Sequence, residues 1–465
     1  MLNERLQRMR NKLFDSRPCI TAERLVLATE AYRKYAGDAV PIFRAEVVKY
    51  IMDHMTTLIM DDELIVGTPT NKYRGANLHP EFQSSTEFYL AELDQFAQRT
   101  KDPYDISDED KALIRETLPY WKGKAMQDMA KTALPAGILE RIHDDIITVG
   151  LTNGVSGETT CDHEKLLRVG LKGYMEECQR NIDALLPHSQ LDQEKIDFWR
   201  ACIIQCQGLI DYAHRMGDEA ARQAAACSDE KRKQELLTVA ENCRVVPENP
   251  PQNFWQALQL VWFVHVYFHI EVCTTANGFG RFDQYMWPYY KKDVLEDKTL
   301  TADQALELLE CFYLKCCEVF EVRDKWYATS FAGYPMWELL VVGGQTPDGK
   351  DASNALSYVC LEAASELKTT QPVMAVRVWS GTPEALIRKG CEMIQDGQAN
   401  PGFFNDEVAM QMALGKGCSL EEARDWTIVG CIQPGPGGGG TDGSPDAGYV
   451  NMGKMLEFVL HNGVD

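Results

Sequence analysis

The stretch WTIVGCIQPGPGGGG, at residues 426–440, has two parts of different character. Its first four residues are apolar and strand-like, which predicts a β-strand. The remainder is glycine and proline around Cys431, which predicts a stiff loop that other groups can approach closely. A strand that ends in such a loop is a way to present a reactive sulfur to a cavity. The alternative is that Cys431 is a buried small apolar residue, as most free cysteines are.

Other parts of the chain repeat the order strand, loop, long helix. Short strands are predicted at 64–67, 146–150, 337–344 and 372–378, and helices at 163–186, 190–238, 254–272 and 302–319. Residues 4–61 are predicted to be mostly helical, with Thr21 as an N-cap, and to form an outer layer. This order predicts an α/β fold with a barrel-like or wound sheet. Its candidate site lies in the loops at strand ends, near Glu158, Gly343, Ser380 and Cys431.

Composition limits the classes of partner. The chain has 465 residues, with 69 acidic against 47 basic residues and a net charge of −22. This balance disfavours nucleic acids and anionic membranes, so small molecules and proteins are the expected partners. Fifteen cysteines are scattered through apolar helical stretches and no secretory segment is evident, which predicts reduced thiols in the cytoplasm. The apolar stretch 254–272 contains too many polar groups for a membrane span.

Three familiar chemistries could use Cys431. A thiolate nucleophile needs a base, and His461 is the only histidine near it in sequence. A metal site would need paired ligands, but there is no Cys-x-x-Cys, and His265 and His269, although four residues apart, lack an evident third ligand. We expect these two histidines to be core residues and no metal to be bound. A nucleotide site is suggested by G-x-G-x-x-G at 435–440, but no lysine completes it and Pro436 removes a donor.

A fourth chemistry is radical, in which a thiyl takes hydrogen from an unreactive C–H bond. Several motifs, in order, resemble the pyruvate formate-lyase-like domain of glycyl radical enzymes over practically the whole chain. They are GRFDQY (280–285), PYY (288–290), FAGY (331–334), VVGGQT (341–346), QPVMAVR (371–377), FND (404–406) and VGC (429–431). The resemblance is closest to the branch with glycerol and propanediol dehydratases, choline-cleaving lyases and arylacetate decarboxylases.

The resemblance implies a fold and a radical source. The fold would be a ten-stranded α/β barrel of two half-barrels surrounded by helices, with residues 1–465 forming the N-terminal part of the domain. Cys431 would bear the thiyl radical. The family's glycine-radical segment has no counterpart in this sequence, so we expect the barrel to be incomplete here and the glycyl radical to come from a missing C-terminal segment. A radical-SAM activating enzyme with an iron–sulfur cluster, a homodimer and an anaerobic cytoplasm are also implied.

The resemblance also assigns site residues. Glutamate usually stands two residues after the cysteine in the family's dehydratases, where it acts as a base, and here that position is Gln433, which cannot take a proton at a useful pKa. Glu158 matches a substrate-binding histidine, which implies that it is a relocated acid or base, or a contact to a cationic group. Asp446 and Thr275 match substrate-binding positions, and Trp337 matches an aromatic lining position.

These residues predict a glycyl radical lyase that cleaves a C–C or C–heteroatom bond of a small substrate. The loss of the glutamate favours a decarboxylase or another lyase over a standard dehydratase. A dehydratase of a small polyol or hydroxy compound is the alternative within the family. An inactive fragment or a split subunit with a binding role is the alternative outside it.

Overall fold

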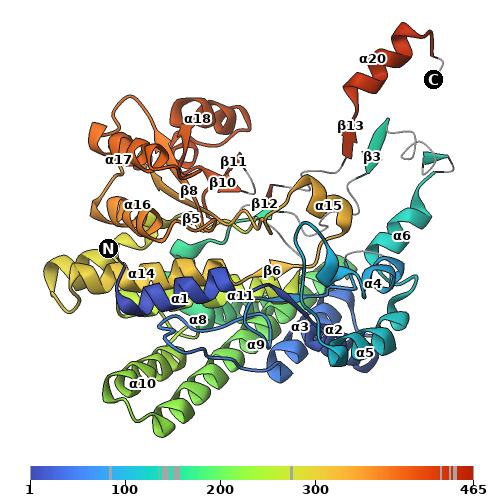
Figure 1. The fold of residues 1–465 in the computed structure, drawn as a ribbon, viewed down its shortest axis with the longest axis horizontal. Helices are drawn as coiled ribbons and strands as arrows, with labels where there is room; N and C mark the ends of the chain where they lie inside the picture. Colours follow the sequence, from blue (N-terminus) through green and yellow to red (C-terminus); the bar gives the residue numbers. More distant parts are fainter. Residues whose placement is uncertain are drawn as a thin grey trace.

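The computed structural model describes residues 2–82, 86–135, 137–138, 146–149, 158–272, 276–429, 432–438, 441–442 and 448–463. Figure 1 shows a parallel sheet with helices packed around it, above a layer of long helices built from the first half of the chain. The α/β class predicted from the order of elements is therefore confirmed.

The helices of the first half form the outer layer and part of the core. They are α1 (Glu4–Asp15), α2 (Glu23–Lys34), α3 (Val40–His54), α4 (Thr86–Glu92), η1 (Phe96–Gln98), α5 (Asp108–Thr117), η2 (Leu118–Trp121), α6 (Met126–Ala133), α8 (His163–Ala184), α9 (Gln190–Ala226) and α10 (Glu230–Val245). The second half of the chain supplies the remaining helices. They are α11 (Phe254–Glu271), α12 (Phe282–Tyr285), α13 (Trp287–Tyr290), η4 (Lys291–Glu296), α14 (Ala302–Cys316), α15 (Lys325–Ser330), α16 (Ala355–Leu367), α17 (Glu384–Gln395), α18 (Asp406–Gly415), α19 (Leu420–Arg424) and α20 (Met452–Leu460).

The main sheet has four parallel strands in the order β5-β7-β8-β9. These strands are β5 (Gly280–Arg281), β7 (Leu339–Gly343), β8 (Val373–Val378) and β9 (Gly402–Asn405). Strand β7 is buried along its whole length and reads as a continuous apolar run, as expected where both faces of a parallel sheet are covered. The strands predicted at 337–344 and 372–378 are thus confirmed, with slightly shorter bounds.

The remaining strands form a second parallel sheet and three antiparallel pairs. The second sheet has the order β1-β2-β6, from β1 (Cys19–Thr21), β2 (Gly75–Asn77) and β6 (Phe320–Glu321). The pairs are β10 (Thr427–Val429) with β11 (Gln433–Gly435), β4 (Glu158–Thr159) with β12 (Thr441–Asp442), and β3 (Ile147–Val149) with β13 (Gly448–Val450). The strands predicted at 146–150 and 426–429 are confirmed.

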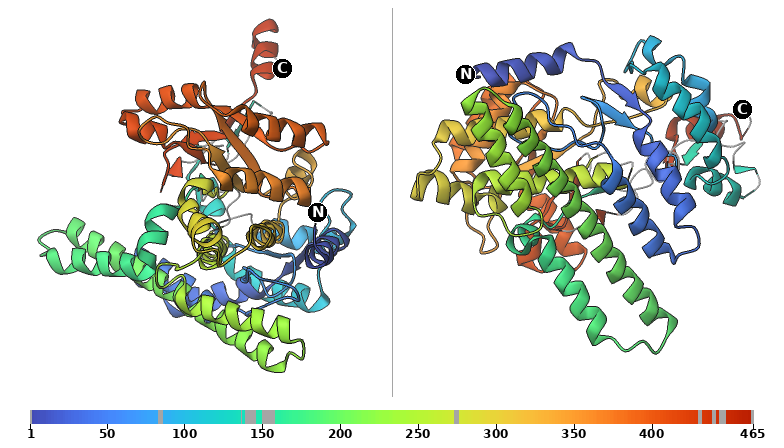
Figure 2. Two further views of the ribbon diagram at one scale, coloured as in Figure 1. Left: turned by 90° about the vertical axis from the view of Figure 1, so that its left-hand side faces the viewer. Right: turned by 90° about the horizontal axis from the view of Figure 1, so that it is seen from below.

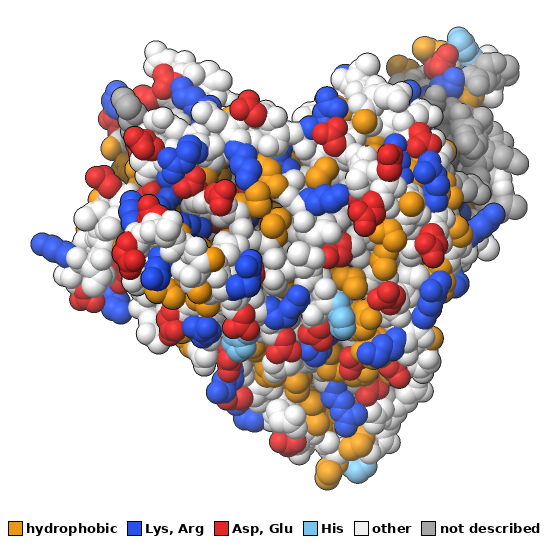
Figure 3. Space-filling view, turned by 60° about the horizontal axis from the view of Figure 1, so that its bottom comes forward, with side chains coloured by type: hydrophobic (Ala, Val, Ile, Leu, Met, Phe, Trp, Pro, Cys, Tyr) orange, Lys and Arg blue, Asp and Glu red, His pale blue; other side chains and the backbone are white. Residues whose placement is uncertain are grey.

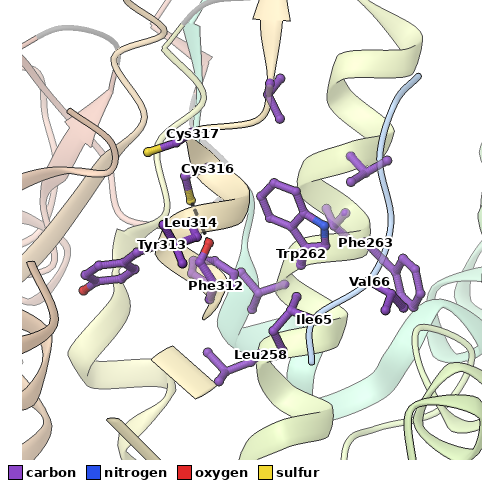
Figure 4. Packing of buried hydrophobic residues seen from close by; sticks show 14 of the residues in the cluster. Ile65, Val66, Leu258, Trp262, Phe263, Phe312, Tyr313, Leu314, Cys316 and Cys317 are labelled. Carbon is purple, nitrogen blue, oxygen red and sulfur yellow. Dashed lines mark hydrogen bonds between the residues drawn. The ribbon is translucent and has the colours of Figure 1, made fainter. Parts of the chain in front are cut away.

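Helix α11 forms the centre of the hydrophobic core. It is apolar around its circumference, as expected of a helix with neighbours on all sides. In Figure 4, Leu258, Trp262 and Phe263 of α11 lie between residues of α14, such as Phe312, and the segment at Ile65. No helix in the described part of the chain is long and apolar enough to cross a membrane, in keeping with the polar groups seen in stretch 254–272.

The prediction of a strand at 64–67 is wrong, because side chains of α11 hydrogen-bond to the backbone of this segment. Side chains of α11 take the place of a neighbouring strand: Gln259 accepts from the backbone N–H of Val66 (3.0 Å) and donates to its carbonyl oxygen (2.7 Å). The indole nitrogens of Trp255 and Trp262 donate to the carbonyl oxygens of Leu64 and Gly67. The segment is apolar because it is buried, and its polar backbone groups are satisfied by side chains.

Two further expectations need correction. Thr21 is not the N-cap of a helix but the last residue of β1, and Ala22 precedes α2 without a side-chain cap. The helix predicted over 190–238 is two helices, because the chain turns at 227–229 and the side chain of Asp229 caps α10 by accepting from the backbone N–H of Arg232.

The surface and the C-terminal helix complete the description. On the face in Figure 3, acidic and basic side chains are interspersed, with hydrophobic side chains between them. Helix α20 projects away from the main sheet in both Figure 1 and Figure 2 and has no buried residue. Its large apolar side chains are exposed; they are Met452, Met455, Leu456, Val459 and Leu460.

Candidate active site

The strand that leads to Cys431 is part of a tight antiparallel hairpin. Strand β10 pairs with β11, so that Gln433 lies opposite Val429 and Gly435 opposite Thr427. Residues 430–432 connect the two strands, and Cys431 itself lies outside the described residues. Gln433 is half-buried.

The glycine-rich continuation of this hairpin packs tightly against the chain that precedes it. A Cβ atom at Gly437 would lie 2.0 Å from the carbonyl oxygen of Asp425, which no side chain could tolerate. Gly437 and Gly438 also line a cavity of about 750 Å³ together with Thr160, His163 and Arg281. Gly437 is therefore required for the close approach of two backbone segments.

The segment that contains Glu158 lies beside the glycine-rich loop. Asp442 of β12 is the register partner of Glu158, and Thr160 bridges to Gly278. The side chain of Glu158 lies outside the described residues, as does Asp446. The strands on either side of Asp446, β12 and β13, pair with β4 and β3, the strands on either side of residues 150–157. The structure thus brings the backbone segments of these two predicted residues together.

Gly278 is the point where the segments meet. Its backbone N–H donates to the carbonyl oxygen of Thr159 (3.0 Å), and the N–H of the next residue, Phe279, donates to that of Leu339 (2.7 Å). A Cβ at position 278 would lie 3.0 Å from the carbonyl oxygen of Ile428 in β10. Strand β10, the Glu158 segment and strand β7 therefore all pack around one residue without a side chain.

Trp337 lies two residues before β7 and is joined to this meeting point. The backbone N–H of Ala276 donates to the carbonyl oxygen of Met336 (2.6 Å), which places the neighbour of Thr275 beside Trp337. Thr275 itself lies outside the described residues. Trp337 is half-buried, packs against the cluster that includes Leu339 and Ile428, and has a positive φ of 50°. Such a backbone conformation is unusual for a bulky residue and is typical of functional positions.

His461, the base considered for a thiolate mechanism, follows a helix that has no buried residue. His461 is the C-cap of α20, is exposed, and belongs to the helix that projects away from the main sheet (Figure 1). The described residues therefore give no support to a Cys431–His461 pair.

Two buried arginines hold the strand ends in place, and the sequence did not reveal their function. Arg377 of β8 donates from Nε to Asp406 Oδ1 (2.5 Å) and from a terminal nitrogen to the carbonyl oxygen of Trp426 (2.7 Å). Burial lowers the pKa of Arg377 to about 10, with the nearby charge of Arg281 acting in the same direction. Arg281 in turn donates to Asp425 Oδ1 (2.8 Å). Both residues occur in motifs noted above, but only their contacts show that they brace β10.

The two histidines of α11 are core residues, as expected. His265 and His269 are 3% and 2% exposed, and burial lowers the pKa of both, that of His265 to about 3. The structure adds Glu338, the residue after Trp337, whose Oε1 lies 2.9 Å from Nε2 of His265. No sequence pattern connected Glu338 to these histidines, since it is 73 residues away.

Comparison with known proteins identifies the family. A family model described as pyruvate formate lyase-like matches residues 2–465. The isethionate sulfite-lyase of Oleidesulfovibrio alaskensis is 35% identical over 473 residues, which cover 99% of this chain and 57% of that protein. A solved structure on 1,2-propanediol dehydration in Roseburia inulinivorans has a TM-score of 0.96 and 35% identity, covering 100% of this chain and 58% of that one. A glycyl radical enzyme from Archaeoglobus fulgidus has a TM-score of 0.92 and 30% identity, covering 99% and 59%.

The chain belongs to the pyruvate formate lyase-like family of glycyl radical enzymes. The family expected from the motifs is confirmed, and so is the fold, because TM-scores above 0.9 to these enzymes establish the same α/β barrel architecture. The chain spans 57–59% of the length of these relatives. An inactive or purely structural chain finds no support in the comparisons, since the curated relative is a lyase by name.

Proposed function

We propose that this chain provides the thiyl-bearing part of a glycyl radical lyase that acts on a small organic substrate. Cys431 abstracts the hydrogen atom, and Glu158, Gln433, Asp446, Thr275 and Trp337 surround the substrate. The observation that carries the proposal is the meeting of segments at Gly278: the hairpin of Cys431, the segment of Glu158 and the start of β7 are all in backbone contact there. We place the substrate beside this meeting point, at the ends of the segments that Gly278 holds together.

The proposed reaction conserves atoms and electrons at each step. The Cys431 thiyl takes a hydrogen atom from a substrate C–H bond, which leaves a Cys431 thiol and a carbon-centred radical. A C–C or C–heteroatom bond next to that radical then breaks. The product radical takes the hydrogen atom back from the thiol, which restores the thiyl. The glycyl radical that first generates the thiyl is supplied by a segment outside the sequence described here.

The amide side chain of Gln433 is the basis for the class of bond cleavage that we propose. An amide donates and accepts hydrogen bonds but does not exchange a proton near neutral pH, so it can orient a substrate but cannot act as the base of a dehydration. This supports decarboxylation or another lyase reaction. The 35% identity to an isethionate sulfite-lyase supports loss of a heteroatom substituent as one such reaction. Dehydration of a small hydroxy compound is the second candidate, since the structural relative from Roseburia inulinivorans concerns 1,2-propanediol.

We also propose the proteins with which this chain works. A radical-SAM activating enzyme with an iron–sulfur cluster would generate the glycyl radical, and the sensitivity of that radical to oxygen requires an anaerobic cytoplasm. We also propose a homodimer as the working form of the enzyme.

The test uses the protein encoded by the complete gene, activated anaerobically by its radical-SAM enzyme. Electron paramagnetic resonance should show a glycyl doublet, and product analysis should show turnover of one class among hydroxyalkanesulfonates, arylacetates and diols. Cys431→Ala should retain the doublet and lose turnover, because the radical is then generated but not relayed. Turnover by Cys431→Ala, or activity in wild-type protein without any doublet, would refute the proposal.

A further inference from the structure

A cavity of about 420 Å³ lies at the amino ends of strands from both parallel sheets. This volume is within the range of about 300–1,000 Å³ that is usual for small-molecule sites. Its walls contain residues from five segments, each of which precedes a strand. The segments are 13–18 before β1, Arg74 before β2, 316–319 before β6, 333–336 before β7 and 369–371 before β8.

Arg74 is a charged group in the wall of this cavity that lacks a counter-charge. Its guanidinium forms no ion pair with a carboxylate of the described residues, and its hydrogen bonds go to backbone carbonyl groups. The buried arginines Arg24 and Arg377, by contrast, pair with Glu81 and Asp406. Burial lowers the pKa of Arg74, because the charged form loses hydration that nearby groups do not fully replace. A bound anion would supply the missing counter-charge.

The unpaired edge of this guanidinium has the shape that recognises a carboxylate. Nη1 of Arg74 donates to the backbone carbonyl oxygens of Leu13 (2.8 Å) and Ser16. Nε and Nη2 have no hydrogen-bond partner among the described residues, and of these two nitrogens only Nε is enclosed by protein. They form one side of the planar guanidinium, where two parallel N–H groups match the two oxygens of a carboxylate. A carboxylate at this edge would satisfy both donors.

The packing around Arg74 fixes the direction of this edge. The guanidinium carbon lies over the ring of Phe320, 4.8 Å from its centroid, while the two carbonyl groups hold Nη1. Arg74 has a positive φ of 51°, and Tyr334, which also lines the cavity, has a φ of 54°. Residues other than glycine rarely adopt this conformation, and those that do cluster where ligands bind. The guanidinium is therefore held in position before a ligand arrives.

Apolar side chains form another part of the wall. Asp15 is the only carboxylate among the described residues that line the cavity, and it is exposed and forms no ion pair with Arg74. Arg17 adds a second positive charge at the exposed rim, where it pairs with Asp105 (3.1 Å). The wall therefore suits an anion that carries a short apolar group. The buried apolar residues of the wall are Leu13, Val319, Phe320 and Met336.

We propose that this cavity binds a small organic acid, whose carboxylate pairs side-on with Arg74 and whose apolar part contacts Val319 and Met336. Met336 is the neighbour of Trp337, so an occupant would contact the segment that carries this residue of the proposed substrate site. Trp337 and Gln433 themselves do not line the cavity. Binding is therefore separate from the radical reaction, and its test needs no activated enzyme.

The experiment is isothermal titration calorimetry of the complete, unactivated protein with hexanoate. We expect saturable binding of one hexanoate per chain. Hexanamide, which lacks the charge, and acetate, which lacks the apolar part, should each bind at least about tenfold more weakly. Absence of hexanoate binding, or equal binding of hexanamide, would overturn the proposal. Tighter binding of inorganic phosphate than of hexanoate would also overturn it, since the apolar wall would then contribute nothing.

Substitution of Arg74 locates the binding at this cavity. Arg74→Lys keeps the positive charge but loses the planar pair of donors, so hexanoate should bind about tenfold more weakly. Equal affinity of this variant and the wild type would show that the guanidinium does not hold the carboxylate. Because Arg74 also holds the backbone at Leu13 and Ser16, its replacement can disturb folding, and a second variant is needed that leaves the core intact.

That second variant changes the charge of the wall at an exposed position. Thr370→Glu places a negative charge beside the cavity and should weaken hexanoate binding about threefold while leaving hexanamide binding unchanged. Thr132→Glu, at an exposed position of α6 that does not line the cavity, is the matched control and should bind hexanoate as the wild type does. Equal hexanoate binding by Thr370→Glu and Thr132→Glu would place the ligand elsewhere and refute the proposal.

Discussion

Nε of Arg377 donates to Oδ1 of Asp406 over 2.5 Å, and both side chains are completely buried. The same oxygen of Asp406 accepts from the indole nitrogen of Trp426 (2.7 Å), and Arg377 donates to the backbone carbonyl oxygen of Trp426 (2.7 Å). Since Trp426 precedes β10, this pair joins strands β8 and β9 to the strand that leads to Cys431. The pair therefore links the stability of the sheet to the position of the proposed radical residue.

We expect Asp406→Asn to destabilise the protein by about 3–5 kcal/mol, because it leaves the buried guanidinium of Arg377 without its counter-charge. The measurement is the urea dependence of unfolding. Glu384→Gln is the matched control, since Glu384 pairs with Arg388 on the exposed face of α17 and surface pairs contribute little. Equal urea midpoints for Asp406→Asn and the control would show that the pair does not brace the sheet.

Gly278→Ala should lower turnover more than it lowers stability. The added methyl group would lie 3.0 Å from the carbonyl oxygen of Ile428 and 3.1 Å from Oγ1 of Thr160, so β10 must move by a few tenths of an ångström. A shift of that size in a reacting group reduces the rate by about tenfold. The measurements are turnover by the activated complete protein and the melting temperature. Gly415→Ala is the control, because a Cβ there meets nothing within 4 Å; a similar loss of turnover in both variants would contradict the prediction.

The carboxylate of Glu81 should make stability depend on acid pH. Burial alone would raise its pKa, but Arg24 and Arg44 outweigh burial and lower the pKa from 4.5 to about 2. Because the folded-state pKa is depressed, the contribution to stability is present above the unfolded-state pKa and is lost as pH falls from about 5 towards 2. Its size is about 3 kcal/mol.

The test compares the free energy of unfolding of the wild type and Glu81→Gln across this pH range. The variant should be less stable at pH 7, and its stability should fall less steeply with acid. Glu384→Gln, at an exposed carboxylate, should retain the wild-type slope. Parallel curves for the wild type and Glu81→Gln would mean that the carboxylate is not the group whose protonation lowers stability.

Gln433→Glu should add dehydration to the reactions of the activated complete protein. A carboxylate at this position can accept a proton, which the amide cannot. The wild type should not dehydrate 1,2-propanediol measurably, whereas the variant should release the aldehyde, with a rate that rises with pH as the carboxylate ionises. Gln433→Leu, which can neither bind nor exchange a proton, should be inactive towards the diol. Rapid dehydration by the wild type would show that the base is supplied by another residue.

Several features could be predicted from the sequence because their signals are local. The continuous apolar run of β7 and the strand at 426–429 each depend on neighbouring residues, and both predictions hold. The loop predicted after that strand is wrong in part, because Gln433–Gly435 form β11 and pair with β10. The strand predicted at 64–67 does not form, because the hydrogen-bond partner of this segment is distant in sequence. Its apolar pattern reports burial correctly, but its hydrogen-bond partner is the side chain of Gln259, almost 200 residues away.

For the candidate site, too, some features follow from the sequence and others only from the tertiary structure. The sequence alone determined the family, through ordered motifs, and the candidate residues at positions 158, 275, 337, 431, 433 and 446. Tertiary structure alone decided that the segments of these residues meet at Gly278, that Arg377 and Asp406 brace the strand before Cys431, and that Glu338 completes a cluster with His265 and His269. Helical spacing and strand patterns are short-range properties of the chain, whereas contacts across 29 residues or more form only when packing brings the elements together.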